Sequence, residues 1–153
     1  MPSNRPVRDV MTTEVITFRP NDDVADAMRT LLAREVDGAP VVDDSHVVIG
    51  VMTTGDLIVR EIRLHFPTVL SIFGASIEFN RKSFDEDIEK ALGSKVGDVM
   101  SQPPITCEAD DTLGDAATLM HEHGVSRLPV VESSRLVGIV SRGDILRGML
   151  AFR

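Results

Sequence analysis

Apolar and polar residues follow the same order twice along this chain, and that order predicts helices and strands. In the first half, residues 22–34 carry apolar side chains at helical spacing, which predicts an amphipathic helix with one buried face. A short apolar run at 15–18 precedes this helix, and two β-branched runs at 39–42 and 47–52 follow it as predicted strands. A second helix is predicted to start at Thr53.

The second half of the chain repeats the first half with an offset of 89 residues. VRDVM at 7–11 aligns with VGDVM at 96–100, and the apolar run PVV occurs at the matching place in both halves. After a one-residue deletion the offset becomes 88, and GVMTTGD at 50–56 aligns with GIVSRGD at 138–144. Because the register holds over about 50 positions, the chain contains an internal duplication.

Each copy has the predicted order β-α-β-β-α, which places the chain in the α+β class with an α/β-type repeat. One copy alone could bury only one face of its sheet, so we expect a pseudo-two-fold pair. We assign residues 1–64 to the first copy, 65–95 to an insert and 96–153 to the second copy. The insert is apolar at 66–79, and we expect it to cover the pair or to contact another protein surface.

Composition excludes several classes of function. The chain of 153 residues is 42% hydrophobic, and its formal net charge is -8, which disfavours nucleic acid and anionic membranes as partners. No apolar run approaches the roughly 20 residues that cross a bilayer, and the N-terminus has no apolar stretch of signal-peptide type. Cys107 is the single cysteine. We therefore expect a cytoplasmic protein that binds neither nucleic acid nor membrane.

The residues that most enzymes and metal sites need do not occur in suitable patterns. His121 and His123 are two apart on a predicted helix, so they do not share a face, and Cys107 aligns with the strand residue Phe18. We find no nucleophile with a plausible base, no metal-ligand cluster and no glycine-rich loop ending in Lys. We expect no catalytic residue, no metal and no enzyme activity.

The repeated helix start carries the main candidate chemistry. Thr53 with Asp56, and Ser141 with Asp144, have the spacing of a capping box, which satisfies helix N–H groups. The same helix start also suits a phosphate, and an adjacent carboxylate could accept hydrogen bonds from ribose hydroxyls. Arg142, within the second motif, could bind a phosphate bidentately. The motif alone leaves the structural and the binding interpretation open.

Taken together, the VRDVM and VGDVM segments, the PVV strands and the repeated G-h-x-(T/S)-x-x-D motif resemble a cystathionine-β-synthase-type (CBS) domain pair, or Bateman module. The resemblance covers nearly the whole chain except the insert. It implies a two-fold pair with two clefts, which commonly forms a homodimer and senses AMP, ADP, ATP or S-adenosylmethionine. It implies a regulatory module without a resident cofactor. Because no attached domain is evident, the regulated protein is expected to be a separate molecule.

The resemblance also implies which residues contact the ligand. Its adenine slots are lined by the first strand and by the residues before the PVV strand, here Val15, Ile16, Gly38, Ala39, Pro104, Ile105, Arg127 and Leu128. Ribose and phosphate contacts fall on Thr53, Asp56, Ser141, Arg142 and Asp144. Gly38 leaves room where Arg127 fills space or meets phosphate, so we expect either one occupied site or two unlike sites. The alternative is a protein–protein interaction or dimerisation module that binds no ligand.

Overall fold

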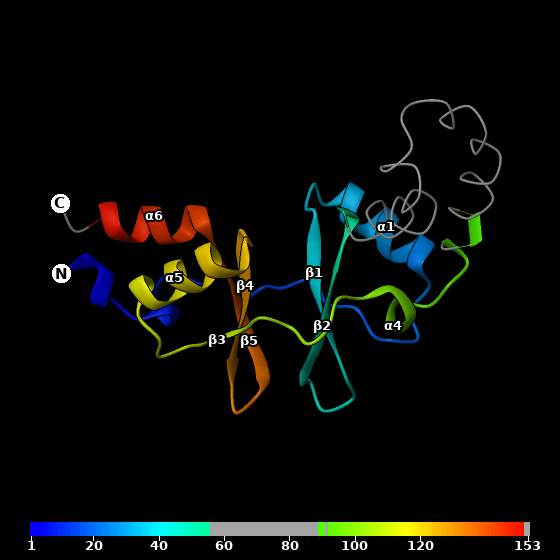
Figure 1. Cartoon of the computed structure of the whole chain (residues 1–153), viewed down its shortest axis with the longest axis horizontal. Helices are drawn as coiled ribbons and strands as arrows, with labels where there is room; N and C mark the ends of the chain where they lie inside the picture. The colour runs from blue at the N-terminus through cyan, green and yellow to red at the C-terminus, as the bar shows by residue number, and fades with distance from the viewer. Residues whose placement is uncertain (56–88, 91, 152–153) are drawn as a thin grey trace, which may run out of the picture. The chain divides into compact units, whose positions relative to one another are not determined.

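The computed structural model describes residues 1–55, 89–90 and 92–151 (Figure 1). The chain groups into two compact units, and each unit takes segments from both sequence copies. Unit 1 comprises Met1–Thr17, Val42–Ile49 and Pro103–Arg153, whereas unit 2 comprises Phe18–Val41 and Gly50–Gln102. The sequence copies and the compact units are therefore different divisions of the same chain.

Unit 1 contains a three-stranded sheet covered by two helices. Strand β3 (Cys107–Glu108) runs parallel to β4 (Arg127–Glu132), which pairs antiparallel with β5 (Arg135–Ser141). Helices α5 (Leu113–His123) and α6 (Arg142–Leu150) pack against each other and contact β4 and β5 (Figure 1). The core of this unit is formed by buried residues of these elements and of the N-terminal segment: Val7, Cys107, Ala109, Leu113, Ala116, Met120, Leu128, Val130, Val140 and Ile145.

The leading segment of the first copy completes unit 1. It forms two short 3-10 helices, η1 (Pro2–Asn4) and η2 (Val7–Asp9). The Val7 N–H donates to the Asp111 carbonyl at 2.8 Å, and the Val7 side chain is fully buried in the core. Farther along, Thr12 and Ile139 exchange two backbone hydrogen bonds of 2.9 Å. The first VRDVM segment thus packs on elements of the second copy.

Unit 2 is built in the corresponding way, with a segment of the second copy packed on elements of the first. It contains helix α1 (Val24–Ala33), helix α4 (Val96–Val99) and most of a two-stranded sheet of β1 (Gly38–Val42) and β2 (Val48–Thr53). The Val96 N–H donates to the Asp22 carbonyl at 2.8 Å, and Val51 and Ser101 exchange two backbone hydrogen bonds. The VGDVM segment of the second copy therefore packs on elements of the first copy.

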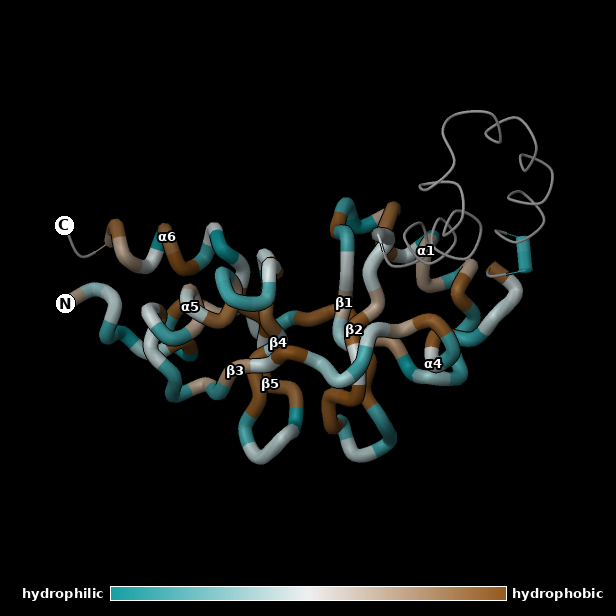
Figure 2. Tube along the Cα trace, viewed as in Figure 1, coloured by the Kyte–Doolittle hydropathy of each residue, from teal (hydrophilic) through white to brown (hydrophobic). Residues whose placement is uncertain are grey.

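The periodicity predicted most elements within two residues of their ends. The helix predicted from Asp22 begins at Val24, and its repeat, which the offset of 89 residues predicts from Asp111, begins at Leu113. The strand predicted at 15–18 reduces to one bridge between Phe18 and Val41. This segment carries the chain from unit 1 into unit 2, so it does not follow one strand for its whole length. Hydrophobic residues follow the strands in Figure 2, whereas the hairpin turns are mostly hydrophilic.

Most of the predicted insert at 65–95, including its apolar centre, lies outside the described residues. Its predicted role as a cover or contact surface stays a prediction. In the described part of the chain, no helix combines the length and the hydrophobicity needed to cross a bilayer.

Candidate functional site

The start of α6 is a capping box, as the motif Ser141-x-x-Asp144 predicts. Ser141 is the N-cap residue; its Oγ accepts the Asp144 N–H at 3.1 Å, and its own N–H donates to Asp144 Oδ2 at 2.9 Å. The Arg142 N–H donates to the Ser126 carbonyl at 2.9 Å. The structural interpretation of the motif is therefore confirmed for the second copy, and it accounts for one of the two Asp144 oxygens.

The other Asp144 oxygen is held by a residue that the motif does not include. Arg147 Nη2 donates to Asp144 Oδ1 at 2.7 Å. The Asp144 side chain is 16% exposed and the Arg147 side chain is 74% exposed. The carboxylate is therefore mostly buried, and the guanidinium that pairs with it lies at the surface. Asp144 and Arg147 are three residues apart on a helix, and this spacing is the sequence signal that could have indicated the ion pair.

Three arginines gather around this capped helix start. Arg127 begins β4 directly opposite Ser141 in the strand register, and the exposed Arg142 is the first residue of α6. Arg147 lies one turn farther along the same helix. In a chain of net charge -8, three arginines on residues near one helix start are a candidate feature for attracting an anion.

Unit 1 also holds most of the residues predicted for the adenine slots. Val15 packs against a small core of Val42, Val48, Val131 and Leu136, and Ile105 packs against the main core. Ile16 and Pro104 are half-buried. Leu128 is fully buried within the main core, so only its backbone is available to a ligand.

The first-copy residues Gly38, Ala39 and Thr53 belong to unit 2. A Cβ built on Gly38 would lie 2.9 Å from Thr53 Cγ2, so the glycine lets the threonine methyl group approach the backbone. Ala39 is buried. The Thr54 N–H donates to the Asp37 carbonyl at 2.8 Å, which matches the bond between Arg142 and Ser126 in the second copy. Asp56, the predicted ribose contact, lies outside the described residues.

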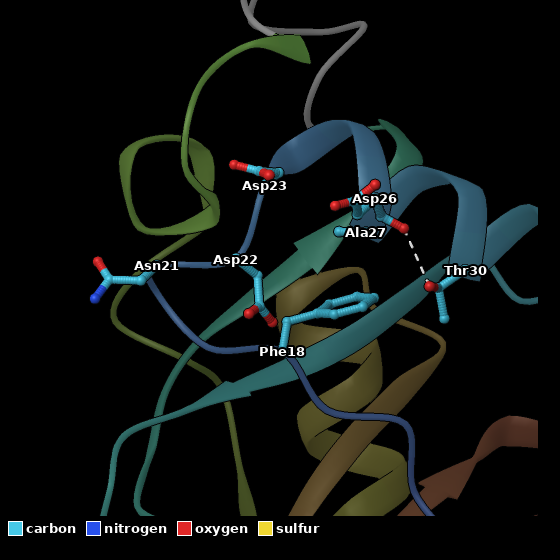
Figure 3. Close-up of a pocket in the computed structure, with 7 residues that line it drawn as sticks. All are labelled: Phe18, Asn21, Asp22, Asp23, Asp26, Ala27 and Thr30. Carbon is cyan, nitrogen blue, oxygen red and sulfur yellow. Dashed lines mark hydrogen bonds between the residues drawn. The ribbon is translucent and has the colours of Figure 1, made fainter.

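The lining of a pocket in unit 2 includes none of the predicted ligand contacts (Figure 3). Its lining consists of Phe18, Asn21, Asp22, Asp23, Asp26, Ala27 and Thr30. The three carboxylates already have partners, because Asp22 Oδ2 accepts the Arg19 N–H, Asp23 pairs with Lys95 and Asp26 pairs with Arg29. An acidic lining of this kind repels phosphate, so this pocket does not suit a nucleotide.

The remaining chemical candidates have structural explanations. Burial raises the pKa of the Cys107 thiol to about 12, with smaller contributions from Asp111 and Glu108, so the reactive thiolate is disfavoured. His121 and His123 are exposed in the last turn of α5. Among the described residues, no three His, Cys, Asp or Glu side chains are grouped to hold a metal ion.

Comparison with known proteins agrees with this fold. The CBS domain profile matches residues 7–62 and 96–151. The uncharacterized protein MJ1426 of Methanocaldococcus jannaschii is 30% identical, with 94% of this chain and 90% of that protein covered. The chloroplastic CBS domain-containing protein CBSX2 of Arabidopsis thaliana is 33% identical over 96% of this chain, which spans 64% of that protein.

A solved structure extends the comparison to three dimensions. The crystal structure of CBSX2 in complex with AMP has a TM-score of 0.73 and 30% identity, covering 97% of this chain and 98% of that one. The mixed α/β architecture and the resemblance inferred from the repeats are thereby confirmed. The two profile matches, the related sequences and the shared fold together show that this chain belongs to the CBS domain family, as a CBS domain pair.

Proposed function

We propose that this chain is a regulatory module that binds an adenine nucleotide or a related adenosyl ligand and acts on a separate partner protein. One observation carries the proposal: the Ser141–Asp144 capping box, with arginines around it, opens a helix in a chain whose relative CBSX2 was crystallised with AMP. The module is proposed to be regulatory rather than catalytic and to work in the cytoplasm.

The second-copy helix start is proposed to bind the ribose and phosphate. Asp144 accepts hydrogen bonds from the ribose hydroxyls, while Ser141 and Arg142 meet the phosphate at the N-terminus of α6, where the helix dipole favours an anion. The predicted slot residues of unit 1, Val15, Ile16, Pro104 and Ile105, offer apolar side chains for the base. Thr53 and Asp56 are proposed to do the same work for the first copy.

Thermal unfolding with a ligand panel tests the proposal. The panel contains AMP, ADP, ATP, NAD and S-adenosylmethionine, each added to the whole chain. A ligand at 100 times its Kd stabilises the folded state by about 2.7 kcal/mol. We expect at least one ligand to raise the Tm, and the absence of any shift across the panel would contradict ligand sensing.

Two aspartate variants separate a ligand contact from a helix cap. Asp144 and Asp115 occupy the same position in two capping boxes, at the starts of α6 and α5. Asp144→Asn is expected to weaken ligand binding, whereas Asp115→Asn is expected to leave it unchanged while making the same change in a comparable cap. Equal loss of binding in both variants would show that the effect is only structural.

A second candidate function, a protein–protein interaction module without a ligand, is favoured by one surface feature. Leu146 and Leu150 are 55% and 63% exposed and lie one turn apart on α6. Exposed leucines so spaced form an apolar strip that a second copy of the chain could cover, in line with the predicted homodimer. Ligand binding and homodimer formation are separate proposals, and either can hold without the other.

A further inference from the structure

The ion pair between Arg147 and Asp144 occupies the oxygen that a ribose would need. Asp144 Oδ2 is held in the helix cap by the Ser141 N–H, so Oδ1 is the oxygen that remains outside the cap. In this structure Oδ1 accepts the bond from Arg147 Nη2. A ribose that binds Asp144 as proposed above must therefore displace the guanidinium or share this oxygen with it.

When a ribose displaces Arg147 from Asp144, the guanidinium of Arg147 is close enough to the helix start to bind a phosphate. A Cβ built on Gly143 would lie 3.2 Å from Arg147 Nη1, so the guanidinium rests over the first turn of α6, close to the backbone of Gly143. The side chain is largely exposed and can turn without disturbing the core. A guanidinium at a helix N-terminus can bind phosphate through two parallel hydrogen bonds.

At two aligned positions the second copy carries an arginine where the first copy carries no charge. Arg127 lies opposite Ser141, and Arg142 follows Ser141 along the chain. The aligned first-copy residues are Gly38 and Thr54, which carry no charge. Each phosphate added to a ligand adds negative charge, so the attraction of these arginines for a ligand grows with phosphate number.

We propose that Arg147 is a specificity-determining residue of the second-copy site. It pairs with Asp144 in this structure and contacts the ligand's phosphates when ribose hydroxyls take its place on Asp144. The site consequently selects nucleoside di- or triphosphates over AMP and adenosine. This inference rests on the proposed function, and it adds a residue and a ligand class to it.

Isothermal titration with adenosine, AMP, ADP and ATP tests this role. The whole chain carries Asp56→Ala so that the first-copy site contributes as little as possible, and Arg147→Gln is compared with Arg147 intact. A lost hydrogen bond between charged groups lowers the ratio of ATP to AMP affinity by about tenfold or more. The affinity for adenosine is expected not to fall, and Arg147→Lys is expected to restore part of the ratio.

The control variant is Arg29→Gln. Arg29 pairs with Asp26 across the same three-residue spacing at 2.7 Å, and its side chain is also 74% exposed. It lies on α1 and is not among the residues predicted to bind ligand, so its replacement is expected to change no affinity.

Three outcomes would overturn the inference in different ways. Equal weakening of all four ligands by Arg147→Gln would show that Arg147 only orients Asp144. An unchanged ATP to AMP ratio would remove Arg147 from the site and leave the proposed function standing. Failure of the wild-type chain to bind any of the four ligands or S-adenosylmethionine would overturn both proposals together.

Discussion

The sulfur atom of Met11 lies against Gly138, so closely that no other residue fits at position 138 without a shift. A Cβ built on Gly138 would lie 2.7 Å from Met11 Sδ and 2.9 Å from the Thr12 carbonyl oxygen. In unit 2, a Cβ on Gly50 would lie 2.6 Å from Met100 Sδ. The first glycine of the repeated motif therefore gives room to the VRDVM or VGDVM segment of the other sequence copy, and this role does not depend on any ligand.

Gly138→Ala is expected to destabilise the fold. The added methyl group must displace Met11 or the backbone at Thr12, and overpacking of this kind typically costs about 1–3 kcal/mol. Urea unfolding measures the loss. Gly55→Ala is the control, because the nearest atom to a Cβ at Gly55 is Thr53 Oγ1 at 3.9 Å. A Gly138→Ala chain as stable as the wild type would contradict the close contact.

Ser141→Ala is expected to lower the free energy of unfolding by about 1 kcal/mol, because it removes an N-cap hydrogen bond. Thr112→Ala should cost a similar amount, since the Thr112 Oγ1 accepts the Asp115 N–H at 3.0 Å in the same arrangement. Chemical denaturation of both variants checks this. If Ser141 also meets phosphate, its replacement alone weakens AMP binding, and an equal effect of both variants on AMP would exclude that contact.

The stability of the chain is expected to fall at alkaline pH through Cys107. Its thiol has an ordinary pKa of 9.0, which burial raises to about 12 in the folded chain. Between these values the unfolded chain loses a proton that the folded chain keeps, so rising pH favours unfolding. From pH 8 to pH 10 the wild type should lose about 1 kcal/mol more than Cys107→Ala.

Chemical labelling provides a second check on Cys107. A thiol-reactive disulfide reagent at pH 8 should modify the folded chain slowly and the urea-unfolded chain fast, because the thiolate is the reacting form. Fast labelling of the folded chain, or equal pH slopes in the wild type and Cys107→Ala, would show that the thiol is accessible.

The exposed leucines of α6 lead to a prediction about self-association. Leu146→Glu places a charge in the apolar strip, and if a second copy covers that strip, the dimer dissociation constant should rise about tenfold or more. Sedimentation velocity measures the change. Ser45→Glu, in an exposed turn, adds the same charge elsewhere and should leave association unchanged. A wild-type chain that stays monomeric at all concentrations would rule the homodimer out.

Local patterns in the sequence were sufficient to predict the elements and the helix cap. Apolar spacing placed α1, and β-branched runs placed β1 and β2, because burying one face needs a fixed periodicity whatever the neighbours are. The Ser141 cap followed from the three-residue spacing to Asp144, since both partners belong to the same helical turn.

Sequence did not reveal the Arg147 bond to Asp144. Arginine three residues after an aspartate is common on exposed helices, and such pairs contribute little by themselves. Its meaning depends on which Asp144 oxygen the cap has already taken and on how close the guanidinium lies to the backbone of Gly143. Both are properties of the folded helix start.

The sequence by itself determined that the chain is duplicated and that each copy carries the G-h-x-(T/S)-x-x-D motif. It also determined where most helices and strands lie. Only the tertiary structure decided that Val7 and Val96 pack on the opposite copy's elements. The physical reason is that Asp111 and Asp22 present equivalent carbonyl groups in the frameworks of the two sequence copies. Either carbonyl could accept the N–H of Val7 or Val96. Which of the two each segment bonds therefore depends on the path of the whole folded chain.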